Sequence, residues 1–281
     1  MPYNMKKADM KSITEGYGLH PNRKYGQNFL VDDYTTDKLL KIIDIQTGDR
    51  ILEIGPGLGA LTGKMTERCS RLTAVEIDSG ICRYLEDSLG SVPNFTLVHG
   101  DFLKTELEDN FTKIVSNLPY YCATEILFTV AGKFSARDIF VMVQKEMADR
   151  IMSPPGSKVY GALTVTLGYY YRARAVLQLG NDVFHPRPDV GSTFLHLSRR
   201  EPRELDDAQL EMFHLLVKSA FWGRRKTLLK TLSESPHLRL EKNLVRSVIA
   251  EAGIDEKIRG EELSSGDYIR LALLFAKNDN M

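Results

Sequence analysis

From about residue 35, short apolar runs alternate with segments of helical spacing, and this alternation limits the possible folds more than any other feature. Leu39, Leu40, Ile42 and Ile43 repeat at helical spacing, and the run Arg50–Ile54 that follows has the length of a buried strand. Strands that alternate with helices predict an open, mostly parallel α/β sheet. The predicted strands are 50–54, 72–77, 95–99, 113–116, 139–143, 173–179 and 193–197, with helices at 58–69, 81–89 and 124–131. The last two strands are close enough in sequence to pair antiparallel at one edge.

A charged segment, Ser198–Asp207, ends this alternating pattern. It contains three Arg and four Asp or Glu residues around a proline, the composition of a linker or boundary. Beyond it the apolar residues repeat only at helical spacing, from Leu210 to Phe275. We therefore expect a sheet domain over residues 1–200 and a small helical domain over residues 201–281.

The bulk composition excludes several classes of protein. The 281 residues carry 37 Lys or Arg and 37 Asp or Glu, so any basic surface must be local. Three cysteines without a CxxC spacing indicate reduced thiols in a cytoplasm rather than a disulfide framework or a zinc site. The N-terminus is polar, and no run approaches 18 apolar residues, so we expect neither a signal peptide nor a membrane span.

The most specific chemical signal is the tetrapeptide Asn117-Leu118-Pro119-Tyr120, which follows a short apolar run at 114–115. The side-chain oxygen of Asn117 and the backbone carbonyl of Leu118 can accept both hydrogens of an exocyclic amine. Pro119 biases Leu118 toward an extended conformation, which directs that carbonyl. Tyr120 offers a ring on which a flat base can stack. The same residues also fit an ordinary strand-to-helix turn with a buried Tyr.

A glycine-containing loop and two acidic residues predict a cofactor site on the same sheet. Gly55 and Gly57 follow the first strand, where glycines allow a sharp turn and close approach of a ligand. The string also fits a dinucleotide fingerprint, so NAD stays open on the loop alone. Glu53 before the loop would repel a pyrophosphate but suits a cationic ligand, which favours S-adenosylmethionine. Glu76, 23 residues after Glu53, is spaced to reach a ribose, and Asp101 follows the next strand. Helix capping is the alternative role for both acids.

Four segments that contain or surround these motifs resemble the KsgA/RsmA-type adenine dimethyltransferases of small-subunit ribosomal RNA. They are Lys24–Leu30, Asn117–Tyr120, Phe184–Ser192 and Phe221–Leu228, and the likeness runs from about Lys24 to the C-terminal helices. The resemblance implies a Rossmann-like class I methyltransferase sheet and S-adenosylmethionine as the cofactor. It also implies dimethylation of two adjacent adenosines in the loop of the 3′-terminal hairpin, as part of small-subunit biogenesis.

The resemblance also assigns roles to individual residues. The opening segment, with Gln27, Asn28 and Leu30, resembles the part of the family that covers the cofactor. In relatives, the residues that match Asn28, Leu30, Gly55, Glu76, Asp101 and Asn117 line the cofactor site, and Gly57 lies in the same loop. Phe184 resembles the aromatic residue placed on the target base, so that Tyr120 and Phe184 would sandwich the purine.

Local charge predicts the RNA-binding surface. Eight Lys or Arg and two Glu lie between Val217 and Arg246, a net charge of +6 within a neutral chain. A solvated helix face is the ordinary explanation of such a run, but the resemblance favours RNA contact for Arg224, Arg225 and Lys226. Trp222 is expected to be a packing anchor. We expect small-subunit rRNA as the partner, and a monomer without metal or membrane.

Three other functions compete with this interpretation. The related large-subunit (23S) rRNA adenine methyltransferase of the macrolide-resistance type shares the fold and cofactor. A non-catalytic ribosome assembly factor would bind RNA without needing Glu76, Asp101, Asn117 and Tyr120. An NAD-dependent oxidoreductase fits the glycine loop, but the sequence shows no catalytic His, Lys or Tyr constellation for it.

Overall fold

The computed structural model describes residues 7–19, 27–200, 204–238 and 240–279. Their contacts divide the chain into two compact units, Met1–Ala148 with Ala173–Arg199, and Asp149–Arg172 with Arg200–Met281. The sequence predicts a single boundary near residue 200, whereas the structure groups Asp149–Arg172 with the C-terminal helices. The assignment of the two domains to methyl transfer and RNA binding stays a prediction.

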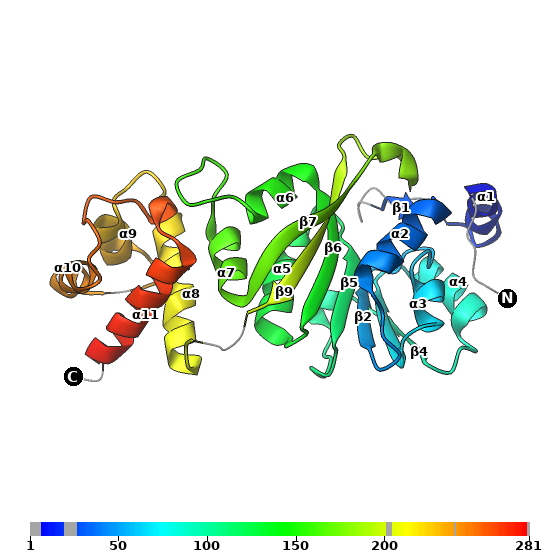
Figure 1. Cartoon of the computed structure of the whole chain (residues 1–281), viewed down its shortest axis with the longest axis horizontal. Coiled ribbons are helices and arrows are strands. Elements are labelled where there is room, and N and C mark those ends of the chain that lie inside the picture. The colour runs from blue at the N-terminus through cyan, green and yellow to red at the C-terminus, as the bar shows by residue number, and fades with distance from the viewer. Residues whose placement is uncertain (1–6, 20–26, 201–203, 239, 280–281) are drawn as a thin grey trace. The chain divides into compact units, whose positions relative to one another are not determined.

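The first unit is built on a seven-stranded sheet with strand order β4-β3-β2-β5-β6-β9-β7 (Figure 1). The pairs β4–β3, β3–β2, β2–β5 and β5–β6 are parallel, and β9 runs antiparallel to β6. The predicted mostly parallel sheet with an antiparallel edge is therefore confirmed. The strands are β2 (Arg50–Ile54), β3 (Arg71–Glu76), β4 (Phe95–His99), β5 (Lys113–Asn117), β6 (Asp138–Gln144), β7 (Tyr171–Leu179) and β9 (Ser192–Arg199).

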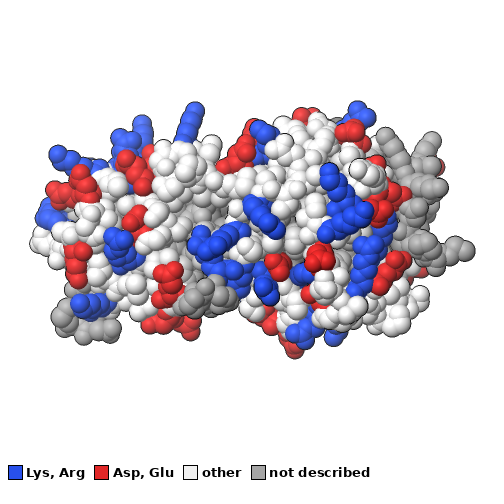
Figure 2. All heavy atoms as spheres, viewed as in Figure 1, with Lys and Arg blue, Asp and Glu red and all other residues white. Residues whose placement is uncertain are grey.

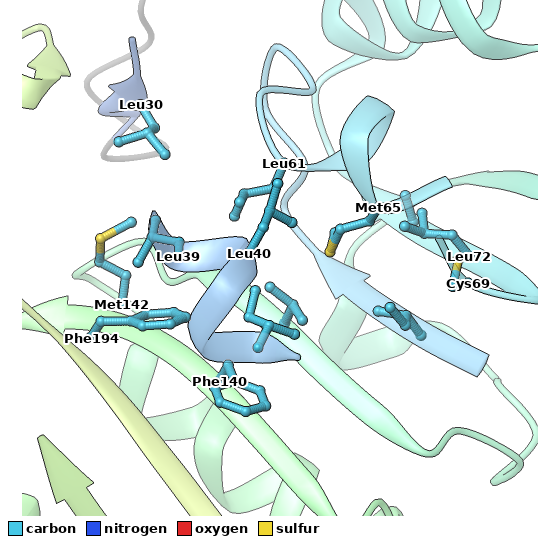
Figure 3. Close-up of a cluster of buried hydrophobic side chains, with 14 of the residues drawn as sticks. Leu30, Leu39, Leu40, Leu61, Met65, Cys69, Leu72, Phe140, Met142 and Phe194 are labelled. Atoms are coloured by element: carbon cyan, nitrogen blue, oxygen red, sulfur yellow. The ribbon is translucent and has the colours of Figure 1, made fainter. Parts of the chain in front are cut away.

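Helices pack on this sheet through apolar faces. Leu39, Leu40 and Ile43 of α2 and Met65 of α3 are buried against sheet residues such as Phe140, in the cluster of Figure 3. Burial of such side chains contributes about 1.5–3 kcal/mol each to folding. Besides α2 (Asp33–Ile43) and α3 (Thr62–Thr66), the helices of this part are α1 (Lys7–Gly16), α4 (Ser79–Leu89), η2 (Phe102–Lys104), α5 (Ala123–Lys133), α6 (Lys145–Ile151) and η3 (Asn181–Val183).

The helix after the first sheet strand is shorter than predicted. The sequence pattern indicates a helix over 58–69, but α3 covers only Thr62–Thr66. The residues before α3 form a loop in which Gly55, Gly57 and Gly59 have φ values of 69°, 55° and 80°. This left-handed conformation is accessible mainly to glycine and cannot continue into a helix.

A second, two-stranded sheet joins distant parts of the chain. β1 (Phe29–Leu30) pairs antiparallel with β8 (Phe184–His185), and the Val31 amide donates to the Val183 carbonyl at 2.9 Å. Two-residue strands give little sequence signal, and neither strand was predicted. The pairing connects the residues before α2 to the loop that contains Phe184.

The second unit is helical. Its helices are α7 (Ala162–Tyr170), α8 (Asp207–Trp222), α9 (Leu228–Glu234), α10 (Lys242–Glu251), η4 (Gly260–Glu262) and α11 (Ser265–Asp279). The Tyr160 hydroxyl donates to the Leu263 carbonyl at 2.8 Å, and the Gly156 amide donates to the Glu261 carbonyl at 2.8 Å. These bonds explain why residues 149–172 belong with the C-terminal helices. No helix in the described ranges is long and apolar enough to cross a membrane.

Candidate active site

A cavity lies at the carboxyl ends of β2, β3 and β5, where an open parallel sheet ordinarily binds its ligand. Ten of the eleven residues predicted for cofactor binding or catalysis line it: Gln27, Asn28, Leu30, Gly55, Gly57, Glu76, Asp101, Asn117, Leu118 and Tyr120. Phe184 is the exception. Lys24, Tyr25 and Gly26, which begin the segment that resembles the cofactor cover, lie outside the described residues.

The glycine loop forms one wall of the cavity and is held by backbone hydrogen bonds. The Gly55 amide donates to the Val75 carbonyl at 2.9 Å, and the Gly57 amide donates to Glu76 Oε2 at 3.3 Å. A Cβ atom at Gly57 would lie 3.1 Å from Cδ1 of the Phe29 ring. Positive φ and this close approach together explain why glycine occupies position 57.

Two buried carboxyl groups lie beside the loop. Glu53 is 3% exposed, and burial raises its pKa to about 8, with a further contribution from the charge of Glu76. Burial also raises the pKa of Glu76, although the amides of Asp78 and Gly57 donate to its carboxylate and oppose that shift. Among the described atoms, Glu53 Oε2 has no hydrogen-bond partner. Because burial keeps Glu53 protonated near pH 7, a cationic ligand bound beside the pair would favour release of this proton.

The charge of the whole cavity lining also favours a cationic ligand. Of the described residues that line the cavity, four are acidic and none is Lys or Arg. The four acids are Glu53, Glu76, Asp101 and Glu125. A pyrophosphate would be repelled by such a lining, whereas a sulfonium would be attracted. The residues present therefore fit S-adenosylmethionine better than NAD.

Asp101 combines the two roles considered from the sequence. Its Oδ1 accepts a hydrogen bond from the Leu103 amide at 3.1 Å, which caps η2. Its Oδ2 lies 3.7 Å from Lys104 Nζ. The side chain is one-third exposed and lines the cavity, so capping leaves lone pairs that can accept from a ligand amine.

Asn117 is oriented by the segment around β1. Its Nδ2 donates to the backbone carbonyl of Asn28 at 2.9 Å. Because this bond uses an N–H group, the side-chain oxygen is available as an acceptor. Leu118 is fixed by its amide, which donates to the Met142 carbonyl at 3.0 Å. Tyr120, half-buried at the same cavity, has a raised phenolic pKa because of burial.

Phe184 lies elsewhere in this structure. Its side chain is 1% exposed and packs in the same core cluster as Leu179 and Phe194. Its strand β8 pairs with β1, so that Phe184 is the register partner of Leu30. A ring buried in this way cannot stack on a base without leaving the core. The sandwich of a target base between Tyr120 and Phe184 stays a prediction, and it would require Phe184 to move.

The predicted basic turn, Arg224 to Lys226, lies between α8 and α9, and two of its three cations are internally paired. Arg224 Nη2 lies 2.7 Å from Glu261 Oε2 and donates to the Lys158 carbonyl at 3.1 Å. Lys226 Nζ lies 3.0 Å from Glu234 Oε2 and 4.8 Å from the centroid of the Trp222 ring.

Arg225 is exposed and forms no ion pair within the described ranges. Trp222, predicted to be a packing anchor, is 47% exposed, so about half of its surface is open to solvent. Arg239, part of the predicted basic run, lies outside the described residues. On the face shown in Figure 2, acidic and basic side chains are interspersed rather than segregated.

Sequence reasoning missed several residues that line the cavity, among them Phe29, Leu103, Tyr121 and Glu125. Tyr121 and Leu103 could have been found by their position, because each lies within two residues of a predicted site residue. Phe29 lies between the predicted residues Asn28 and Leu30 and could have been found in the same way, whereas Glu125 carried no such signal. In the part of the chain that the structure describes, no group of three or more His, Cys, Asp or Glu residues could hold a metal ion.

Comparison with known proteins extends these observations. The sequence matches the ribosomal RNA adenine dimethylase family over residues 18–277. The "Ribosomal RNA small subunit methyltransferase A" of Alkaliphilus oremlandii is 38% identical over 276 residues, covering 95% of this chain and 96% of the relative. The protein of the same name from Clostridioides difficile is 38% identical over 267 residues, covering 92% of each chain.

Solved structures show the same fold. A dimethyladenosine transferase from Plasmodium falciparum superposes with a TM-score of 0.78 at 23% identity, covering 89% of this chain and 98% of the other. The 23S rRNA methyltransferase ErmE superposes with a TM-score of 0.68 at 24% identity, covering 88% and 99%. The predicted class I methyltransferase fold is thus confirmed.

Proposed function

Because the chain belongs to the ribosomal RNA adenine dimethylase family, we propose that it dimethylates adenosine amino groups in small-subunit rRNA. It is a methyltransferase, and S-adenosylmethionine is its methyl donor, as the sequence predicted. The two relatives carry the name of a small-subunit enzyme, and the match to this chain covers more than nine-tenths of each. This favours the small subunit as the substrate here. We further propose two adjacent adenosines in the loop of the 3′-terminal hairpin as the target, with a role in small-subunit biogenesis.

One observation supports this function best: the acidic cavity and the oriented Asn117 amide occur at the same strand ends. An acidic cavity suits a sulfonium donor, and an amide with a free acceptor oxygen suits an amine nucleophile. An NAD-dependent oxidoreductase would need neither. A non-catalytic assembly factor would have no use for a cavity in which both features are preserved.

The chain's own residues can align and polarise the amine. When bound, S-adenosylmethionine supplies an electrophilic methyl group, so neither a metal nor a covalent nucleophile is required. The side-chain oxygen of Asn117 and the carbonyl of Leu118 would accept the two amine hydrogens and direct the nitrogen lone pair. The same oxygens would stabilise positive charge that develops on the nitrogen. No general base is needed, because the proton can leave to water after transfer.

Tyr120 is the proposed stacking residue for the base in the cavity, a contact worth about 1–3 kcal/mol. Such stacking offsets the few kcal/mol needed to extract a base from its neighbours. Phe184 can join this sandwich only if its ring leaves the core cluster, where it is 1% exposed. We therefore assign the first contact with the base to Tyr120.

RNA affinity is proposed to come from the basic turn of the second unit. Arg225 is the residue best placed for phosphate contact, since Arg224 and Lys226 already have acidic partners. An rRNA substrate and three free cysteines support a cytoplasmic location. We propose a monomer that acts without a metal ion and without a membrane.

The decisive experiment offers both ribosomal subunits, isolated from cells that lack this modification, to the purified protein with labelled S-adenosylmethionine. We expect label only in the small subunit and dimethyladenosine in its 3′-terminal hairpin when the rRNA is digested and analysed by mass spectrometry. Label in the large subunit alone would instead support the macrolide-resistance type of enzyme. Binding without transfer would support an assembly factor.

A further inference from the structure

Two exposed apolar side chains lie at the rim of the active-site cavity. Tyr121 is 59% exposed and Leu103 is 38% exposed, and both line the cavity. Residues that are exposed and also line a cavity belong to its mouth. An exposed aromatic ring at the mouth of a nucleotide site is a ready stacking platform.

The turn that contains Tyr120 separates the two neighbouring tyrosines. The Cys122 amide donates to the Pro119 carbonyl at 3.4 Å, and α5 begins immediately afterwards at Ala123. Within this tight turn Tyr120 is half-buried whereas Tyr121 is exposed. The ring of Tyr120 therefore lies inside the opening, and the ring of Tyr121 lies at its edge.

The charge of the cavity decides which part of an RNA can reach this edge. Asp101 and Glu125 line the cavity together with the buried Glu53 and Glu76, and no described lining residue is Lys or Arg. Glu53 stays protonated near pH 7 because burial raises its pKa to about 8, and Asp101 Oδ2 lies 3.7 Å from Lys104 Nζ. The exposed Glu125 is therefore the acid that disfavours the sugar–phosphate backbone at the mouth. The uncharged face of a base is not repelled, and an apolar ring stabilises it.

We propose that Tyr121, with Leu103 beside the same opening, stacks on the unpaired nucleotide next to the adenosine held in the cavity. This proposal rests on the proposed function, because it requires a single-stranded rRNA loop as substrate. Tyr121 is thus a positioning residue that acts on the neighbouring base rather than on the reacting amine. Where two adjacent adenosines are targets, one would lie on the Tyr121 rim while the other occupies the cavity.

The test compares Tyr121→Ala and Tyr121→Phe with Tyr34→Ala as a matched control. Tyr34 is 77% exposed but does not line the cavity. We expect Tyr121→Ala to raise KM for small subunits about 5- to 150-fold, the range expected from loss of one stacked base. Tyr121→Phe keeps the ring and should stay within about twofold of the wild type, as should Tyr34→Ala. The dissociation constant of S-adenosylmethionine should be unchanged in all three variants.

A second arm identifies the contacted group. Small subunits are reconstituted with rRNA in which one of the two adenosines is abasic, and methylation of the other is measured. In the wild type, the abasic site should raise KM by about the same factor as the Tyr121→Ala substitution does with intact rRNA. In the Tyr121→Ala variant, the abasic site should raise KM little further.

Independent, multiplicative effects of the abasic site and the variant would overturn the proposal. An unchanged KM in Tyr121→Ala would also overturn it, as would a loss of cofactor affinity, which would indicate a structural role. A wild-type protein that does not methylate small subunits would instead refute the proposed function.

Discussion

Replacement of Glu53 by Gln should reduce the change in the free energy of unfolding between pH 5 and pH 8. Glu53 is 3% exposed in β2, and burial, together with the nearby Glu76, raises its pKa from 4.5 to about 8. Between these two pH values the folded state keeps a proton that the unfolded chain has released. The stability associated with the neutral carboxyl is therefore fully present below pH 4.5 and is lost as the pH rises through 8.

The size of the effect follows from the two pKa values. One pH unit of difference corresponds to about 1.4 kcal/mol, so the free energy of unfolding should fall by about 3 to 4 kcal/mol between pH 5 and pH 8 from this group alone. The Gln side chain cannot titrate. Its amide would leave a buried N–H unpaired near the position of Oε2, at a cost of about 1–3 kcal/mol at every pH. The variant should thus be less stable than the wild type at pH 5 and equal or more stable at pH 8.

Urea denaturation at pH 5, 6, 7 and 8, followed by circular dichroism, measures the difference between the two proteins. The transition of the first unit is identified by its displacement when S-adenosylmethionine is added. Glu67→Gln makes the same chemical change at an exposed position and should give a curve parallel to the wild type. If the Glu53→Gln curve is also parallel to the wild type within about 1 kcal/mol, the assignment of a neutral buried carboxyl is wrong.

Four further substitutions test other parts of the molecule. Asn117→Ala should lower kcat at least about 100-fold with an unchanged circular dichroism spectrum, and near-normal turnover would refute its proposed role. Arg225→Ala should weaken binding to small subunits and reduce its salt dependence by about one counterion. Arg224→Ala should weaken binding less, because Arg224 is paired with Glu261, and an equal loss in both variants would contradict this distinction. Gly57→Ala, at a φ of 55°, should destabilise the first unit by about 1–2 kcal/mol in thermal denaturation, and an unchanged Tm would show that the loop tolerates a side chain.

The central strands of the sheet could be predicted from the sequence because they are buried on both faces. The run Arg50–Ile54 stands out against polar loops and coincides with the observed strand β2. Phe95–His99 also coincides with an observed strand, β4, although this edge strand is only partly buried. The placement of residues 149–172 could not be predicted in the same way. It depends on tertiary bonds such as the one from Tyr160 to Leu263, about 100 positions away, which leave no local pattern.

The candidate site was predictable to the extent that it follows strand ends. Glu76, Asp101 and Asn117 end or follow parallel strands, and the topology of the sheet brings such positions to one edge. Phe184 and Arg224 were harder to interpret because their environments are set by distant partners. Pairing of β8 with β1 buries Phe184, and Glu261 engages Arg224, and neither partner is adjacent in sequence.

The separation of charges explains how a chain with no net charge can act on a polyanion. The described lining of the cavity contains four acids and no Lys or Arg, so the catalytic opening itself repels phosphate. Under the proposed function, affinity for RNA would come from cations outside the cavity, such as Arg225, and the opening would admit an uncharged base rather than a phosphate. Selection at the opening and affinity elsewhere thus call for opposite local charges, which a chain with no net charge can supply. Raising the net charge with Lys or Arg at the rim would therefore be expected to slow methyl transfer even as it strengthened RNA binding.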